Sequence, residues 1–230
     1  MVARAPVPKP DPPVTSQTLL LIPTPLEAQR LAQAGPWPPG VRVECCGFGP
    51  VAAAARTAQL LAAHSPARVL LVGIAGSYDP QALPVGQAQA FAQVALDGVG
   101  AGEGAEFLGP AQMFPQWSPE DGSEPVVDRL ELLLPAEFAG PTTALLVSAC
   151  AAAGSQAQAE TRRARHPGAL AEDMEAFSVA FACRLAGVPC GVVRGVSNAV
   201  GQRDPVSWSI DPALDAAYRL ALDWIEAATR

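Results

Sequence analysis

Two glutamates and one asparagine occupy positions where this chain could do chemistry. Glu27 follows a short apolar segment at residues 17–23, and Glu175 has apolar neighbours on both sides. Asn198 comes soon after the apolar segment 190–196. A carboxylate can act as a general base or stabilise a developing positive charge, and an amide forms hydrogen bonds without carrying charge. The residue types therefore favour carboxylate chemistry on a polar small molecule.

Taken singly, each of these residues also has a structural explanation. Glu27 suits the first turn of a helix, where the dipole favours a negative charge, and Asn198 suits a turn. Arg203 and Asp204 could form a surface ion pair, which contributes little to stability. The interpretation therefore depends on whether the residues lie together.

Histidine and cysteine chemistry are not expected. His64 and His166 each stand close to a proline near the end of a predicted helix, which favours a surface position. The five cysteines lie in apolar segments without a CxxC pair, so we expect buried free thiols in a reducing cytoplasm, neither a disulfide framework nor a metal site. They are Cys45, Cys46, Cys150, Cys183 and Cys190.

The elements that must position the polar residues alternate between strand and helix. The apolar segments that predict strands are residues 17–23, 41–46, 68–72, 87–95, 142–150 and 190–196. Helices are predicted from about residue 26, over 51–64, from 173–175 onward, and from an N-cap at Asp211 to about 228. This alternation predicts an α/β fold: a single-domain three-layer αβα sandwich with a mixed, mostly parallel central sheet. In such a sheet ligands bind at the carboxyl ends of strands, where Ser197 and Asn198 stand.

Two glycine-containing segments follow predicted strands. Residues 47–52, GFGPVA, fit a loose GxGxxA dinucleotide fingerprint, but no acidic residue follows at the distance that ribose binding requires. We therefore favour a packing turn over a nicotinamide or flavin site and expect no cofactor. Residues 73–77, GIAGS, predict a tight turn in which Ala75 and Gly76 lie close to a ligand. The glycine- and proline-rich region 98–125 is a lid or an interface.

Composition narrows the partners. Residues 1–16 are proline-rich, predict a disordered leader and lack the apolar core of a signal peptide, which leaves residues 17–230 as the domain. The net charge is −7 without a basic stripe, so nucleic acid is not an expected partner. No segment has the length of a membrane span. We expect a cytoplasmic protein that acts on a small molecule.

Four landmarks along the chain carry a family resemblance. They are Glu27 after the first strand, GFGPVAAA at 47–54, VGIAGSY at 72–78, and DMEAFSVAFA at 173–182 followed by VVRGVSN at 192–198. In this order they resemble the nucleoside phosphorylase and nucleosidase superfamily. The most similar groups are the methylthioadenosine/S-adenosylhomocysteine nucleosidases and, beside them, the futalosine hydrolases. The resemblance extends from about residue 19 to the end of the chain.

The resemblance implies roles for these residues. Glu27 would activate or position an attacking water, Glu175 would accept hydrogen bonds from the ribose hydroxyls, and Met174 would pack against the sugar. The adenine-directed enzymes carry aspartate where this chain has Asn198, and an amide suits a 6-oxopurine better. The phosphorylases carry an arginine about where this chain has Leu71, so hydrolysis is favoured, although Arg56 could still reach the site from a helix.

Hydrolysis and an oxopurine together point to the futalosine hydrolases, which release hypoxanthine from futalosine in menaquinone biosynthesis. The ending SNAVGQRDPVSW resembles that group, and we expect Arg203, Asp204 and Trp208 to shape the pocket or lock its lid. The resemblance also implies a homo-oligomer, a dimer or larger. Other purine nucleosidases or phosphorylases acting on inosine, guanosine or methylthioadenosine, and a non-catalytic nucleoside-binding protein, remain the alternatives.

Overall fold

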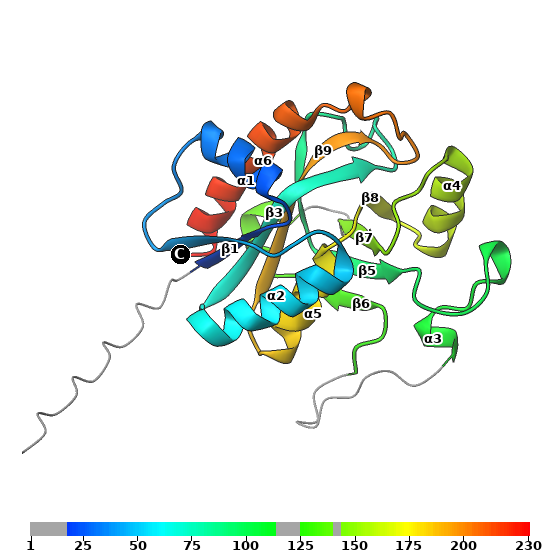
Figure 1. Cartoon of the computed structure of the whole chain (residues 1–230), viewed down its shortest axis with the longest axis horizontal. Coiled ribbons are helices and arrows are strands. Elements are labelled where there is room, and N and C mark those ends of the chain that lie inside the picture. The colour runs from blue at the N-terminus through cyan, green and yellow to red at the C-terminus, as the bar shows by residue number, and fades with distance from the viewer. Residues whose placement is uncertain (1–17, 114–124, 140–143) are drawn as a thin grey trace, which may run out of the picture.

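The computed structural model describes residues 18–113, 125–139 and 144–230 (Figure 1). The helices of these residues are α1 (Pro25–Ala34), α2 (Gly49–His64), α3 (Pro110–Met113), α4 (Gln156–Arg165), α5 (Ala176–Leu185) and α6 (Ile210–Ala227). The strands are β1 (Thr18–Ile22), β2 (Val41–Cys45), β3 (Arg68–Ser77), β4 (Ala88–Phe91), β5 (Gln93–Asp97), β6 (Arg129–Glu131), β7 (Leu145–Ala149), β8 (Ala169–Asp173) and β9 (Cys190–Ala199). Three short 3₁₀ turns complete the list: η1 (Gly104–Glu106), η2 (Ala136–Phe138) and η3 (Pro205–Ser207).

The strands of the described residues form one sheet. Its main path runs β2-β1-β3-β8-β7-β5-β6, and β9 pairs with β3 and β4 beside that path. The pairs β1–β2, β1–β3, β3–β9, β5–β7 and β7–β8 are parallel, whereas β3–β8, β4–β9 and β5–β6 are antiparallel. The predicted mixed, mostly parallel sheet is confirmed.

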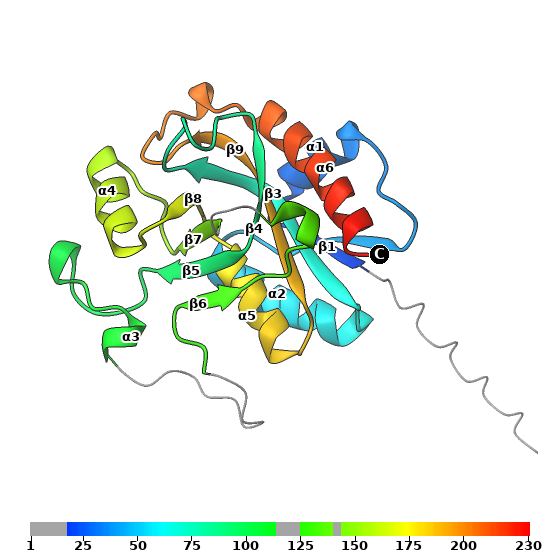
Figure 2. The ribbon, with the colours of Figure 1, turned by 180° about the vertical axis from the view of Figure 1, so that it is seen from behind.

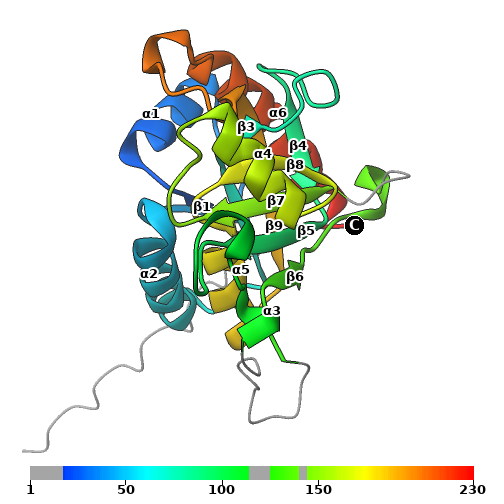
Figure 3. The same ribbon diagram turned by 90° about the vertical axis from the view of Figure 1, so that its right-hand side faces the viewer.

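Helices cover both faces of this sheet, which gives three layers (Figure 3). Along β1, Leu19 and Leu21 enter the core under α2 and α5, while Leu20 and Ile22 enter the core under α1 and α6. Strands buried on both faces are continuously apolar, and β1 is buried at every position. Figure 2 shows α4 at the end of the molecule away from α1 and α6.

The helix α6 packs directly against β9 because β9 carries glycines beneath it. A side chain at Gly191 would collide with the indole of Trp224, and one at Gly195 would collide with the backbone of Ala213. Trp224 is fully buried. This close packing holds β9 in place and with it the polar residues at its end.

Several predicted boundaries were wrong. The segment 73–77 is no turn, because β3 continues to Ser77 along the long strand β9. The segment 87–95 is two strands that separate at Ala92, and Ser197 and Asn198 belong to β9. Residue 173 ends strand β8 instead of opening a helix, and α6 begins at Ile210, one residue before the predicted cap at Asp211.

The sequence interpretation missed β6 and β8 altogether and gave no bounds for α4, although it expected a helix to end near His166. His166, predicted on the surface, is buried, and Cys150, predicted as buried, is exposed. The predicted leader 1–16 and residues 114–124 of the predicted lid or interface lie outside the described residues. Among the residues that the structure does describe, no helix combines the length and apolar character needed to cross a bilayer.

Candidate active site

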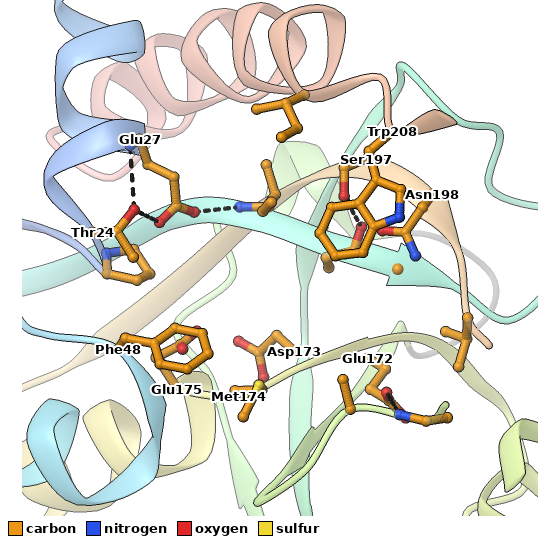
Figure 4. A pocket seen from close by; sticks show the side chains of 18 of the residues that line it. Thr24, Glu27, Phe48, Glu172, Asp173, Met174, Glu175, Ser197, Asn198 and Trp208 are labelled. Atoms are coloured by element: carbon orange, nitrogen blue, oxygen red, sulfur yellow. Dashed lines mark hydrogen bonds between the residues drawn. The ribbon is translucent and has the colours of Figure 1, made fainter. Parts of the chain in front are cut away.

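A cavity of about 400 Å³ lies at the carboxyl ends of β1, β3 and β9, between the first turn of α1 and the end of β8. Glu27, Thr24, Phe48 and Glu175 lie at one end, and Glu172, Asn198 and Trp208 lie at the other (Figure 4). A cavity of this size matches a small-molecule site.

Glu27 is held in the first turn of α1 by its own helix cap. Thr24 is the N-cap residue, and its hydroxyl oxygen accepts a hydrogen bond from the Glu27 amide at 3.3 Å. The same hydroxyl donates to Glu27 Oε2 at 2.6 Å, and the Ile74 amide donates to Oε1 at 3.0 Å. The carboxylate is therefore turned inward to β3 and is only 6% exposed. Glu27 is therefore not a solvent-exposed residue that merely stabilises the first turn of its helix.

The turn before α2 positions Glu175. Gly47 and Gly49 adopt φ of 94° and 78°, which favours glycine, and the Gly49 amide donates to Glu175 Oε1 at 2.9 Å. Burial raises the pKa of Glu175 to about 7, although the charge of Arg194 acts in the opposite direction. The glycine segment that resembled a dinucleotide fingerprint thus positions the carboxylate of Glu175 at the cavity.

An arginine within β9 supports these carboxylates. Arg194 is fully buried and pairs with Asp173 Oδ2 through Nε at 3.0 Å and through Nη2. Nη2 also lies 3.3 Å from Glu175 Oε2. Asp173 in turn accepts the Ala176 amide at 3.0 Å at the start of α5. The guanidinium therefore joins β8, β9 and α5 beneath the cavity.

Gly73 makes room for this arrangement. A side chain there would collide with Arg194 Nη1 and would lie 2.7 Å from Glu27 Oε1. Both groups therefore crowd the same point on β3. Among the described residues, Nη1 has no hydrogen-bond partner, which leaves a buried N–H beside Glu27.

At the far end, Ser197 orients Asn198. The Ser197 hydroxyl donates to Asn198 Oδ1 at 2.8 Å, and Asn198 Nδ2 donates to the Ala199 carbonyl at 2.8 Å. Among the described residues, the other contact of Nδ2 is with the Gln202 carbonyl, at the long distance of 3.5 Å. Asn198 is 7% exposed and lines the cavity. One N–H of this amide therefore remains available for a ligand.

The rim of the cavity includes the loop after β9. The Arg203 guanidinium lies over the Trp208 ring at 5.4 Å, and the Trp208 indole donates to the Gln202 carbonyl at 3.2 Å. Asp204 does not line the cavity; it is exposed and accepts the Val206 amide at 3.1 Å, which caps η3. It contributes to the loop and not to the cavity wall.

Residues 38–226 match the family model described as the Phosphorylase superfamily. The chain belongs to this superfamily. It is 36% identical over 205 residues to a futalosine hydrolase of Streptomyces coelicolor, an alignment that covers 80% of each chain. It is 30% identical over 167 residues to a 5'-methylthioadenosine/S-adenosylhomocysteine nucleosidase of Chromohalobacter salexigens, with 70% of this chain and 68% of that protein covered.

Solved structures show the same fold. A futalosine hydrolase of Helicobacter pylori aligns with a TM-score of 0.67 at 19% identity, covering 93% of this chain and 97% of that chain. A 5'-methylthioadenosine/S-adenosylhomocysteine nucleosidase of Helicobacter pylori, solved with butyl-thio-DADMe-Immucillin-A, aligns with a TM-score of 0.70 at 18% identity, covering 91% and 97%. The nucleoside phosphorylase-like fold predicted from the sequence is confirmed.

Leu71, which stands about where the superfamily's phosphorylases carry an arginine, does not line the cavity, and neither does Arg56, which was expected as a possible replacement. Leu71 is fully buried in β3, and Arg56 on α2 lies 3.7 Å from Glu44. Among the described residues that line the cavity, Arg203 is the single basic one, against four carboxylates. These are Glu27, Glu172, Asp173 and Glu175.

Nine of the ten residues predicted for the site line this one cavity, and Asp204 is the exception. They are Glu27, Ala75, Gly76, Met174, Glu175, Ser197, Asn198, Arg203 and Trp208. The sequence interpretation missed Glu172, Asp173 and Arg194. A signal was present, because a charged residue within an otherwise apolar strand, such as Arg194 in VVRGV, must find a buried partner.

Proposed function

We propose that this protein hydrolyses the N-glycosidic bond of futalosine, releasing hypoxanthine and dehypoxanthine futalosine, in menaquinone biosynthesis. The observation that carries the proposal is the cavity itself, in which Glu27 and Glu175 lie at one end and Asn198 at the other. The similarity to a futalosine hydrolase over 80% of the chain supports this choice within the superfamily.

The carboxylate end suits the ribose. Breaking the bond develops positive charge on the sugar ring, and the buried carboxylates of Glu27 and Glu175 stabilise it. Glu175 accepts hydrogen bonds from the ribose hydroxyls, and Met174 packs against the sugar. Glu27, which lines the same end of the cavity, acts on the attacking water as its general base.

The amide end suits the base. When the bond breaks, its electrons pass to the purine, and a donor at N7 or O6 stabilises them. Asn198 offers an amide hydrogen on the cavity side, since only the 3.5 Å contact to Gln202 engages it. An uncharged donor fits an oxopurine, whose O6 accepts. A 6-aminopurine would present a donor to that same hydrogen.

Water is the favoured nucleophile over phosphate. Four carboxylates and one arginine line the cavity, so a phosphate dianion would meet repulsion. Arg194, the second cation nearby, is committed to Asp173 and Glu175. Among the residues that the structure describes, the sugar end therefore has no free cation to hold phosphate.

A methylthioadenosine/S-adenosylhomocysteine nucleosidase is the second candidate, favoured by the 30% identity to the Chromohalobacter salexigens enzyme. Asn198 weighs against it for the reason given above. We further propose that the protein acts in the cytoplasm, as a homo-oligomer and without a cofactor.

Product analysis tests the proposed reaction. Futalosine is incubated with the protein in buffer without phosphate and in the same buffer with phosphate, and the products are separated by liquid chromatography and mass spectrometry. We expect hypoxanthine and the free sugar product at equal rates in both buffers. A sugar 1-phosphate formed only with phosphate would show that the enzyme is a phosphorylase.

A further inference from the structure

Glu172 is a buried carboxylate at the base end of the cavity, and the proposed reaction does not use it. It is 5% exposed and lines the cavity from β8. Gly76 on β3 pairs with Glu172 on one side and with Asn198 on the other. Glu172 and Asn198 therefore flank Gly76 at a separation of roughly 10 Å between their backbones. The register of β3 and β9 shifts at Gly76, but the Asn198 side chain still lies on the face to which a side chain at Gly76 would point.

Gly76 leaves the space between these two residues open. A side chain there would lie 3.4 Å from Asn198 Nδ2 and 3.1 Å from a methyl group of Val200. Without it, a flat ring can lie over the glycine and present one edge to Asn198 and the other to Glu172. Figure 4 shows the two side chains on opposite walls of the same end of the cavity.

The carboxylate of Glu172 keeps acceptor capacity for a ligand. Oε2 accepts the Tyr78 hydroxyl at 2.8 Å and an N–H of Arg162. Oε1 accepts the Ala153 amide at 2.7 Å, and within the described part of the chain that is its one donor. Because a carboxylate oxygen has two lone-pair positions, Oε1 can accept a second hydrogen bond.

A fixed arginine holds this carboxylate in place. Arg162 Nε donates to Asp97 Oδ2 at 2.7 Å, and Nη2 donates to the Ala151 carbonyl at 3.0 Å. Asp97 is 2% exposed and also accepts hydrogen bonds from Arg165. The guanidinium is therefore held from three sides, which sets the position and the charge of Glu172.

The chemistry of this wall distinguishes two classes of purine. A 6-oxopurine carries a hydrogen on N1, whereas a 6-aminopurine has a lone pair there. The nearby backbone donor, the Ala153 amide, is already used by Glu172 and cannot serve a purine lone pair. A carboxylate facing N1 attracts the oxopurine and repels the aminopurine.

We propose that Glu172 selects the base by accepting the N1 hydrogen of a 6-oxopurine at Oε1, while Asn198 serves the N7 and O6 edge. The inference rests on the proposed nucleosidase function and names a second determinant of its substrate class. This hydrogen bond forms in the bound substrate as well as in the transition state, so it acts on KM more than on kcat.

The variant Glu172→Gln tests the inference. In the wild type, Oε2 accepts from two donors, Tyr78 and the charged Arg162. The carbonyl oxygen of the new glutamine should therefore take the Oε2 position, which places its NH₂ group at the former Oε1 position. That group donates to a purine lone pair at N1 and repels an N1 hydrogen. We expect hypoxanthine affinity to fall about 10- to 100-fold and adenine affinity not to fall.

Calorimetric binding of free hypoxanthine and free adenine measures both effects without turnover. Glu160→Gln is the matched control, because Glu160 is exposed on α4 and accepts from Gln156 there; its ratio of affinities should equal that of the wild type. The base-free sugar product should bind wild type and Glu172→Gln equally, which excludes a general loss of structure.

An equal loss of affinity for both bases in Glu172→Gln, or an unchanged ratio, would overturn the inference. A shifted ratio in a protein that does not cleave futalosine would support the base-selecting role and would overturn the proposed function instead. The two claims can therefore fail separately.

Discussion

At the scale of single residues, Glu27 and Glu175 are both buried carboxylates, but their partners differ. Within the described part of the chain, Glu27 accepts neutral donors, from Thr24 and Ile74, whereas Glu175 has Gly49 and the charged Arg194. The carboxylate that Thr24 and Ile74 hold is the one proposed to act on water, and the carboxylate that Gly49 and Arg194 hold is the one proposed to accept the ribose hydroxyls. This difference underlies the separate roles proposed for the two residues.

Glu27→Gln tests the first role. The amide keeps the size of the side chain but cannot accept a proton, so we expect kcat for futalosine to fall roughly 10²- to 10⁴-fold. Binding of the base-free sugar product, measured by calorimetry, should change little. If kcat stays within a factor of two or so of the wild type, another group activates the water.

The pH profile tests the second role. Glu175 must be ionised to accept the ribose hydroxyls, and burial raises its pKa to about 7. We therefore expect kcat/KM to rise about tenfold per unit at acidic pH and to level off above about pH 7. In Glu175→Gln, kcat/KM should not rise with pH in the acidic range, and its value above about pH 7 should be lower than that of the wild type. A wild-type profile that is flat below neutral pH would contradict the assignment.

The family resemblance predicted most of the site, but not the residues that support it. Glu27, Glu175 and Asn198 were singled out beside apolar strands, their roles were inferred from the resemblance, and the structure brings them into one cavity. Arg194, Asp173 and Glu172 were not, because their importance depends on β8, a strand that the sequence interpretation missed. Partners that lie 19 and 21 residues apart in the chain meet only through the sheet.

At the scale of elements, strand β3 determines how the site is assembled. The segment 73–77 was predicted as a turn because of its two glycines, yet it is extended and pairs with both β8 and β9. Its glycines instead leave space for neighbouring side chains. The absence of a side chain at Gly73 makes room for those of Arg194 and Glu27, and Gly76 lies between Glu172 and Asn198. A glycine in the sequence can mark a turn or a position in a strand where a neighbouring group lies very close, and the residue type alone does not tell the two apart.

Gly73→Ala tests this clearance. The added methyl group would collide with Arg194 Nη1 and crowd Glu27 Oε1, so both side chains must move. We expect kcat/KM to fall roughly 10²-fold, since catalysis is sensitive to displacements of about 1 Å. Gly109→Ala is the control, because a side chain there makes only an ordinary contact at 3.7 Å. Equal activity of the two variants would refute the role of Gly73.

At the scale of the whole molecule, large apolar side chains are exposed where α2 begins. Phe48 is 66% exposed and Val51 is 82% exposed. Phe48 also lines the cavity, and Val51 borders two further apolar hollows that Phe181 of α5 lines as well. An apolar surface continuous with a binding site is typical of a subunit interface.

Light scattering tests the proposed homo-oligomer. We expect the wild-type mass to be a multiple of the 23.7 kDa chain and Val51→Glu to lower it, because a buried unpaired charge opposes association. Val206→Glu is the matched control, since Val206 is 93% exposed on η3; its mass should equal that of the wild type. A monomeric wild type would refute the oligomer.

Substrate preference tests the central claim most directly. Values of kcat/KM are measured in phosphate-free buffer for futalosine, inosine and methylthioadenosine with the same enzyme preparation. We predict rapid release of hypoxanthine from futalosine, much slower release from inosine, and almost no release of adenine from methylthioadenosine. Preferred cleavage of methylthioadenosine would contradict the roles given to Asn198 and Glu172, and futalosine binding without any cleavage would show a nucleoside-binding protein instead of an enzyme.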